Sequence, residues 1–423
     1  MESKTIRIVD AESFDTATAT HALDEKTYQQ AEEIVSRVRS GGESSIREYA
    51  TRFNERRDDQ PLTIGPVEMA DAAARLSSED LDLLKRVATR IGDFAKAQRG
   101  SLSALEMDVP GGKAGHSIEP IARAGCYAPA GRFPLPSTVL MTVVTARVAG
   151  CESVVLATPD PSDLMLAAAH IAGADQVLTV GGAHAIAAMA YGFEGFERCD
   201  VIAGPGNRWV TAAKKIVSGD CGIDMLAGPS ELVLIADDSA DAATVATDLL
   251  GQAEHDVDAR PFLITTSKAL GEDVQAELEK QLETLPTSET ARQSLSENGA
   301  IIVCESMDTV VRICNQLAPE HLELHCQSAD EISTQIRNAG CIFIGHQSAE
   351  VFGDYGVGPN HTLPTSGTAR FSAGLNVFTF LRIRTWLKLD SAPESLVRDT
   401  ARLAELEGLA GHRASSLRRL PPE

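Results

Sequence analysis

Polar residues in separate segments of the chain have the side chains that a divalent metal ion and acid/base chemistry require. Imidazole nitrogen suits zinc and other transition ions, and carboxylate or amide oxygen can complete the metal's shell. An adjacent glutamate and histidine can exchange protons near neutral pH. The residues concerned are Gln252, His255, Glu320, His321, Asp354 and His412. Together they predict one metal site with an acid/base pair beside it.

Two of these signals come as local pairs, and each has a simpler interpretation. Gln252 and His255 lie three residues apart near the end of a predicted helix, so they share one of its faces. A solvated helix end has the same pattern. Glu320 and His321 follow Pro319, which favours a turn. A surface turn would simply expose both side chains.

The other two signals are single residues. Asp354 lies between Gly353 and Tyr355, where an Asx-type turn explains it equally well. His412 lies five residues after Glu407 and fits an exposed helix surface.

The predicted secondary structure that must position these residues changes along the chain. Residues 1–110 are predicted to be mostly helical, since apolar residues recur at three-to-four spacing over residues 28–39 and 78–98. Gly111 and Gly112 interrupt this pattern. Strands are then predicted at residues 154–158, 176–180 and 201–203, and helices at 164–172, 183–191 and 209–217.

A second series of the same kind follows. Strands are predicted at residues 231–236, 261–266, 301–303 and 341–344, and helices at 240–253, with Ser239 as N-cap, and 270–285. Strands that alternate with helices imply parallel sheets covered on both faces. We therefore expect an α/β protein with two Rossmann-like parallel-sheet halves, an N-terminal helical segment and a C-terminal helical extension. The expected boundaries are 1–110, 111–225, 226–370 and 371–423, the last part making a dimer contact.

Glycine-rich loops follow some of these strands. Gly181-Gly182 and Gly204-Pro-Gly-Asn207 come after predicted strands, where parallel sheets bind ligands and glycine lets the backbone approach closely. Ordinary turns explain each loop equally well. The fingerprint Gly-x-Gly-x-x-Gly is absent, so the pattern alone does not establish a dinucleotide site.

Composition limits the partners and the compartment. The formal net charge of −22 repels nucleic acid and anionic membranes, so neither is an expected partner. The chain has no run of about 18 apolar residues that could span a membrane. No apolar segment follows Met1, so no secretory signal is expected and the cytoplasm is the default location. The eight cysteines contain no Cys-x-x-Cys and are expected to be reduced thiols.

Short strings in order along the chain together resemble the histidinol dehydrogenase family. The resemblance runs from about residue 100 to 415 and more loosely into the N-terminal helices. The strings are Gly204-Pro-Gly-Asn207, Gly222-Ile-Asp-Met225, Ala227-Gly-Pro-Ser-Glu231, Gln252-Ala-Glu-His-Asp256, Ala318-Pro-Glu-His-Leu322, Gly353-Asp-Tyr355 and residues 359–371. So many ordered strings make chance similarity negligible.

The resemblance implies a zinc-dependent enzyme that oxidises L-histidinol to L-histidine in two NAD-dependent steps, through an aldehyde held on the enzyme. Glu320 and His321 match the acid/base pair. His321 would take the alcohol proton, and Glu320 would activate the water that attacks the aldehyde. The positions that match the zinc ligands are Gln252, His255, Asp354 and His412. The substrate's imidazole and amine would complete the shell.

The resemblance also implies further contacts. Glu407 would pair with the substrate ammonium, and Glu407 and His412 would come from the second subunit of a homodimer. Substrate contacts match Ser230, His361 and Glu407, and cofactor contacts match Tyr127, His184 and Asn207.

Some positions depart from the family pattern. His184 stands where the family usually has a glutamine that contacts the cofactor, although histidine can also donate a hydrogen bond. Pro129-Ala-Gly131 replaces the usual Pro-Gly-Gly and is followed by Arg132. This segment is similar to relatives that act on other alcohols, including sulfopropanediol dehydrogenases. Two alternatives therefore stand beside histidinol oxidation: a paralogous NAD-dependent dehydrogenase of another amino alcohol or polar diol, and a non-catalytic metal-binding protein on the same fold.

Overall fold

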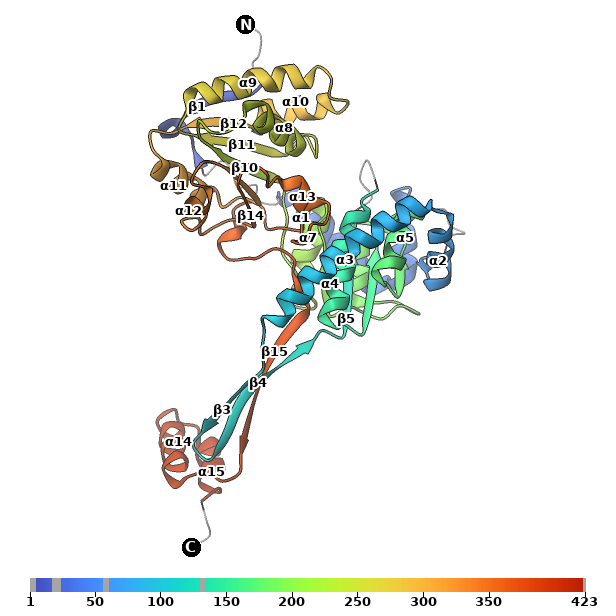
Figure 1. Cartoon of the computed structure of the whole chain (residues 1–423). Helices are drawn as coiled ribbons and strands as arrows, with labels where there is room; N and C mark the ends of the chain where they lie inside the picture. Colours follow the sequence, from blue (N-terminus) through green and yellow to red (C-terminus); the bar gives the residue numbers. More distant parts are fainter. Residues whose placement is uncertain (1–4, 17–23, 56–60, 130–133, 421–423) are drawn as a thin grey trace.

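Two lobes and a projecting arm make up the molecule (Figure 1). The structure is a computed structural model that describes residues 5–16, 24–55, 61–129 and 134–420. Each lobe contains a six-stranded sheet, and a three-stranded sheet forms the arm. No helix in these described ranges is long and apolar enough to cross a membrane.

The sheet of the first lobe has the strand order β2, β7, β6, β5, β8, β9. Strands β5 to β9 pair in parallel, and β2 lies antiparallel to β7 at one edge. The strands are β2 (Thr63–Ile64), β5 (Arg123–Tyr127), β6 (Ser153–Ala157), β7 (Gln176–Leu178), β8 (Val201–Ala203) and β9 (Gly222–Ile223). The central strands are apolar and buried because helices cover both faces.

Two apolar cores hold those helices against the first sheet. One core contains residues of α2, α3, α4 and α5, and the other contains residues of α1, α6 and α7. The helices are α1 (Glu25–Arg52), α2 (Pro66–Arg75), α3 (Ser78–Gly100), α4 (Pro136–Ala149), α5 (Asp163–Ala172), α6 (Gly182–Tyr191) and α7 (Arg208–Val217). Side chains of Asp24, Ser77, Ser162 and Asn207 accept backbone N–H bonds at four of the starting points, which fixes where these helices begin.

The sheet of the second lobe is parallel throughout, in the order β1, β12, β11, β10, β13, β14. Its strands are β1 (Arg7–Asp10), β10 (Glu231–Ala236), β11 (Arg260–Thr265), β12 (Ala300–Val303), β13 (His321–His325) and β14 (Cys341–Ile344). One face packs against α8 (Ala242–Ala253), α9 (Lys268–Leu282) and α10 (Ser288–Asn298). The other packs against α11 (Met307–Leu317) and α12 (Ala329–Ser333), and α13 (Glu350–Asp354) follows β14.

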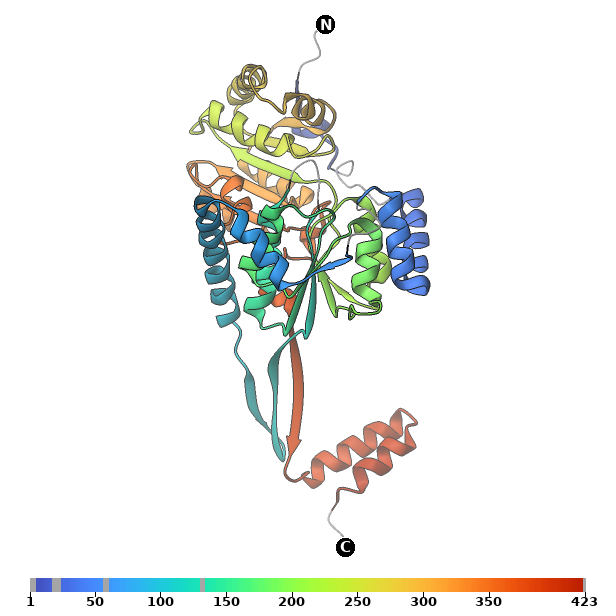
Figure 2. The ribbon, with the colours of Figure 1, turned by 90° about the vertical axis from the view of Figure 1, so that its right-hand side faces the viewer.

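The arm consists of β3 (Leu105–Val109), β4 (Gly112–Pro120) and β15 (Leu381–Leu389), paired antiparallel with β4 in the middle. It ends in two helices that pack on each other, α14 (Glu394–Leu406) and α15 (Ala410–Leu417). Figure 2 shows this helix pair at the tip of the arm, away from both lobes. Large apolar side chains of the arm are exposed: Leu105, Met107, Ile383, Leu387, Leu403, Leu406 and Leu409.

The predicted α/β class with two parallel sheets is confirmed, and most predicted strands and helices lie within two residues of observed ones. All eight cysteines are free thiols, as expected. The prediction that Ser239 is the N-cap of α8 was wrong. The helix begins at Ala242, and the Asp241 side chain accepts from Thr244 N, whereas Ser239 bonds to Asp237.

Three segments differ from their predicted secondary structure or predicted domain. β1, from the segment expected to be helical, pairs with β12 at the edge of the second sheet. Residues 112–120, expected in the first α/β half, form the middle strand of the arm. The expected C-terminal helical extension contains the strand Leu381–Leu389 before its helices.

Candidate active site

Glu320 and His321 lie at the amino end of a central strand, which excludes the simpler interpretation of an exposed turn after Pro319. His321 is the first residue of β13 and stands in register with Leu232 of β10 and Cys341 of β14. Glu320 is 6% exposed and His321 is 3% exposed. The sheet therefore holds both side chains in the interior of the second lobe.

Asp354, the last residue of α13, links this pair to His255. His321 Nε2 lies 3.6 Å from Asp354 Oδ1, and His255 Nε2 lies 3.9 Å from Asp354 Oδ2. On its other side, His321 Nδ1 is 3.7 Å from Glu320 Oε2 and 3.7 Å from Glu350 Oε1. Two imidazoles and three carboxyl groups thus share one small region.

The carboxyl groups control the charge of His321. Burial alone would lower the pKa of His321, but Glu350, Glu320 and Asp354 hold it well above its ordinary range. Burial raises the pKa of Glu320 to about 8 and that of Glu350 well above its usual value. Although burial opposes it, the nearby positive charge of His321 keeps the pKa of Asp354 low. Without a metal ion, the favoured state is an imidazolium beside the Asp354 carboxylate.

Glu231 supports the pair from the neighbouring strand. Its backbone N–H donates to Glu320 Oε2 at 2.9 Å, and its own carboxylate accepts from Ser366 N at 3.1 Å. Arg260 Nη1 lies 3.2 Å from Glu231 Oε1, and both side chains are buried. Ser230, which comes just before Glu231, accepts from Arg260 N at 3.0 Å. These bonds fix the orientation of the Glu320 carboxyl.

His361 has one well-defined tautomer. Its Nδ1 is 2.9 Å from the Asp354 carbonyl oxygen, and its Nε2 is 3.1 Å from Thr138 Oγ1 of the first lobe. Because a carbonyl oxygen only accepts, Nδ1 carries the hydrogen and Nε2 accepts from the Thr138 hydroxyl. Burial lowers the pKa of His361, which favours this neutral form. A substrate that binds His361 Nε2 must displace Thr138.

Two of the four predicted metal ligands, His255 and Asp354, lie close together in the second lobe, and Gln252 lies in α8 of the same lobe. Ligand atoms of His255, Glu350 and Asp354 lie within 4.8 Å of one another. Gln252 is 1% exposed, yet neither its Oε1 nor its Nε2 has a hydrogen-bond partner among the described residues. A buried amide without partners is costly unless something else binds it. This observation fits a metal ion, although α8 ends at Ala253, so Gln252 and His255 do not share a helix face.

Glu407 and His412 are not brought to this region within one chain. Glu407 follows the last residue of α14 and His412 lies in α15, and both are exposed. These helices are at the tip of the arm, far from α13 and β14 (Figure 1). Either these two residues have no role here, or they act on a second copy of the chain.

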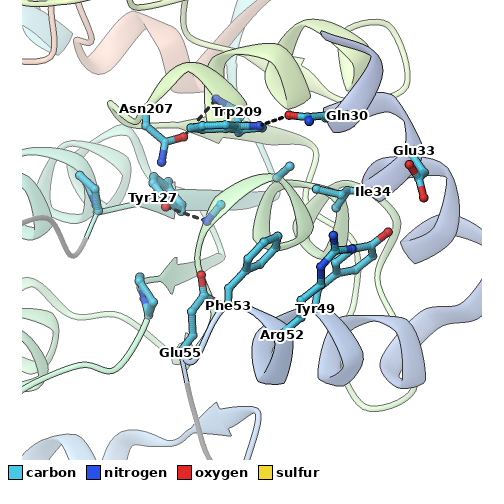
Figure 3. Close-up of a pocket in the computed structure, with 14 residues that line it drawn as sticks. Gln30, Glu33, Ile34, Tyr49, Arg52, Phe53, Glu55, Tyr127, Asn207 and Trp209 are labelled. Carbon is cyan, nitrogen blue, oxygen red and sulfur yellow. Dashed lines mark hydrogen bonds between the residues drawn. The ribbon is translucent and has the colours of Figure 1, made fainter. Parts of the chain in front are cut away.

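A separate cavity of about 600 Å³ opens in the first lobe (Figure 3). Its walls come from α1, the ends of β5 and β6, and the starts of α6 and α7. The side chains labelled in Figure 3 include Tyr49, Phe53, Glu55, Tyr127, Asn207 and Trp209. This position matches the carboxyl edge of a parallel sheet, where such folds bind ligands.

Two of the three predicted cofactor residues line this cavity. The Tyr127 hydroxyl accepts from Gly182 N at 3.0 Å, and Asn207 Oδ1 caps α7 by accepting from Trp209 N at 3.1 Å. His184 is fully buried and is not a lining residue. Its Nε2 lies 2.9 Å from Oε2 of Glu55, which does line the cavity. His184 therefore lies behind the cavity wall, in contact with the lining residues Glu55, Tyr49 and Phe53. Arg132 lies outside the described residues.

Sequence reasoning missed Glu231, Glu350 and Glu55. Glu231 stands in the string Ala227-Gly-Pro-Ser-Glu231, and its place just before an apolar run was an available signal. Glu350 and Glu55 have no local signal, because only the folded chain brings them to His321 and His184.

Comparison with known proteins identifies the family of this chain. A family model described as histidinol dehydrogenase matches residues 18–420. Histidinol dehydrogenase of Prochlorococcus marinus (strain MIT 9313) is 44% identical over 390 residues, covering 91% of this chain and 88% of that protein. That of Methanosarcina mazei is 43% identical over 391 residues, covering 91% and 90%. The crystal structure of histidinol dehydrogenase from Elizabethkingia anophelis has a TM-score of 0.92 and 31% identity, covering 99% of each chain. This chain belongs to the histidinol dehydrogenase family of oxidoreductases.

Proposed function

We propose that this enzyme oxidises L-histidinol to L-histidine in two NAD-linked steps, without releasing the intermediate aldehyde. The observation that carries the proposal is the buried Glu320–His321 pair beside His255 and Asp354. Two hydride transfers from one carbon require a substrate that stays in one place, since a free aldehyde would escape. A rigid acid/base pair next to a metal site meets this requirement.

The two members of the pair have different roles. His321 accepts the alcohol proton in the first step, because its Nε2 has no hydrogen-bond partner among the described residues. Glu320 activates the water that adds to the aldehyde, and the resulting hydrate loses the second hydride. The N–H of Glu231 holds Glu320 Oε2, which leaves the other carboxyl oxygen for the water.

A zinc ion is proposed at Gln252, His255 and Asp354, with His412 of a second copy as the fourth protein ligand. Bound zinc would anchor the substrate's imidazole and amine, and its charge would oppose protonation of His321. The chain's part is to supply a neutral imidazole, a carboxylate and a buried amide with unused hydrogen-bonding capacity.

The arm supports a homodimer with shared active sites. Exposed leucines, a methionine and an isoleucine on β3, β15 and α14 form a surface that a second copy of the chain can cover. A two-fold dimer would let each arm carry Glu407 and His412 to the other lobe. Glu407 of one copy would then pair with the substrate ammonium. Ser230 and His361 would contact the substrate from the copy whose second lobe holds the site.

The cavity of the first lobe is proposed to bind NAD. Phe53 and Trp209 offer flat apolar surfaces for the cofactor rings. The Asn207 side chain uses its oxygen as the helix cap, so its amide nitrogen can donate to the cofactor. The backbone at Gly182, with φ of 60°, allows a close approach to the wall.

The test is to incubate zinc-loaded protein with limiting L-histidinol and excess NAD, and to count NADH per substrate. We expect two NADH per histidinol and histidine as product. One NADH with released aldehyde would contradict the two-step scheme. No turnover with histidinol, but turnover of another amino alcohol or a hydroxysulfonate, would identify a paralogous dehydrogenase. Bound zinc without any hydride transfer would identify a non-catalytic metal-binding protein.

A further inference from the structure

A second cluster of metal-ligating side chains lies further along β13. Residues of a strand alternate between its two faces, so Glu323 and His325 point to the same face as His321. That face meets α8, where Asp248 lies one helical turn before Gln252. Ligand atoms of Asp248, Glu323 and His325 all lie within 4.8 Å of one another.

The three facing atoms are buried but unpaired. His325 Nε2 lies 3.6 Å from Glu323 Oε2 and 3.8 Å from Asp248 Oδ2, both longer than a hydrogen bond. None of these three atoms has a hydrogen-bond partner among the residues that the structure describes. Glu323 is fully buried and His325 is 1% exposed. Native interiors rarely leave such atoms facing one another with nothing between them.

We propose that Asp248, Glu323 and His325 bind a second divalent transition-metal ion, with Zn²⁺ as the suitable probe. One imidazole nitrogen and two carboxylate oxygens are ordinary zinc ligands. Ligands about 2.1 Å from a tetrahedral ion are about 3.4 Å apart, close to the observed separations. Water can fill the fourth position. This site uses none of the residues proposed to hold the first ion.

Shared protons are the competing explanation. Burial raises the pKa of Glu323 to about 8 and that of Asp248 to about 6, and lowers the pKa of His325 to about 4. At pH 7 a cluster without metal would therefore hold a protonated Glu323 and a neutral His325 beside a mostly ionised Asp248. A shared proton would draw its two atoms to within hydrogen-bond distance, however, and the observed separations are too long for that. A bridging ion explains both the burial and the spacing.

The ion would connect elements that carry the active site. It would tie α8, which holds Gln252, to β13, which begins with His321. The other oxygen of Glu323 already accepts from Glu350 N at 2.5 Å, at the start of α13. The second ion would therefore be structural, and its loss would loosen the positions of the first site's ligands.

The test counts ions per chain by mass spectrometry after chelation, reloading with Zn²⁺ and dialysis. We expect two ions in the full-length wild-type protein, one in His255→Ala, one in His325→Gln and none in the double variant. His170→Gln, an exposed histidine on α5, is the matched control and should retain two. If His325→Gln does not fold, Glu323→Gln replaces it, since glutamine keeps an acceptor for Glu350 N. It should also retain one ion.

Crystals of zinc-loaded His255→Ala locate the ion directly. An anomalous peak between Asp248, Glu323 and His325 is expected. The proposal is overturned if wild-type protein retains one ion, His325→Gln keeps it and His255→Ala loses it. That result would still be consistent with the proposed zinc site at Gln252, His255 and Asp354. By contrast, two ions retained by His255→Ala would contradict the ligand set of the proposed active site and not this inference.

Discussion

His321 Nε2 lies 3.6 Å from Asp354 Oδ1, while Asp354 Oδ2 lies 3.9 Å from His255 Nε2. One carboxylate therefore faces both the proposed proton acceptor and a proposed metal ligand. Any change of charge at Asp354 must reach both functions, because electrostatic interactions at this distance are strong in a buried site. Metal retention and proton transfer should consequently respond together to substitution of Asp354.

Asp354→Asn keeps the size of the side chain and removes its charge. We expect zinc binding at the first site to weaken by more than about 100-fold, since losing groups that only orient ligands costs about 10–100-fold. Zinc affinity can be measured by competition with a chromophoric chelator. Asp330→Asn, at an exposed position in α12, is the control and should bind zinc normally. Unchanged affinity in Asp354→Asn would remove this residue from the ligand set.

Glu320→Gln separates the two oxidation steps. Glutamine can still accept the Glu231 N–H but cannot act as a base. Oxidation of added histidinaldehyde should fall by about 10²–10⁴-fold, the usual contribution of a general base. The alcohol step should fall less, which single-turnover measurements of NADH can resolve. Equal losses in both half-reactions would argue against the assigned role.

Mixed dimers test whether active sites are shared. His255→Ala removes a ligand in the lobe, and His412→Ala removes one on the arm, so each homodimer should be inactive. After the two are mixed, unfolded and refolded together, half of the dimers are mixed and each has one complete site. About a quarter of wild-type activity should return. If each site used only its own chain, no activity would return.

The sequence predicted the parallel strands well because their signal is local. β10 and β11 contain uninterrupted apolar runs, at residues 232–236 and 261–264. β13 was missed because histidine and glutamate alternate with leucine along it, and charged residues indicate exposure. Its polar face is buried only because α8 and α13 cover it. The long pairing of β4 with β15 could not be predicted from local sequence either, since it joins distant parts of the chain.

The candidate site was predicted by its residue types but not by its place in the sheet. Glu320 and His321 lie at the amino edge of the second sheet, whereas the general rule points to the carboxyl edge. The cavity beside Tyr127 and Asn207 follows that rule in the first sheet. The roles of Glu350 and Glu55 depend on tertiary contacts, which residue spacing does not encode.

His184 should influence cofactor binding indirectly. Its Nε2 lies 2.9 Å from Glu55 Oε2, which also accepts from Gly181 N at 3.0 Å. His184→Ala leaves the Glu55 side chain with fewer contacts. We therefore expect the KM for NAD to rise by about tenfold, or about 1.4 kcal/mol, just below the ~1.5–3 kcal/mol of a hydrogen bond to a charged group. The kcat should change much less. His184→Gln keeps a donor and should behave nearly as wild type; an equal rise in KM for both variants would contradict this role.

The last prediction concerns the stability of chelated, metal-free protein as pH rises. The pKa of Glu323 is raised to about 8, above its ordinary 4.5, so the folded state binds more protons than the unfolded state between these values. Its stabilising effect is complete below pH 4.5 and is lost as pH rises through 8. His325, with its pKa lowered to about 4, acts in the opposite direction, but only below pH 6.5.

Between pH 6.5 and 8.5 the free energy of unfolding in urea should therefore fall for the metal-free wild type. His321, Glu320 and Glu350, whose pKa values are also raised, contribute to the same slope, so the comparison with Glu323→Gln isolates Glu323. Glutamine keeps the acceptor for Glu350 N and cannot ionise, so this variant should show a shallower slope. Identical slopes would mean that Glu323 does not titrate in this range. Added zinc should reverse the loss in wild type above pH 8, because deprotonated carboxylates are the form that binds the ion.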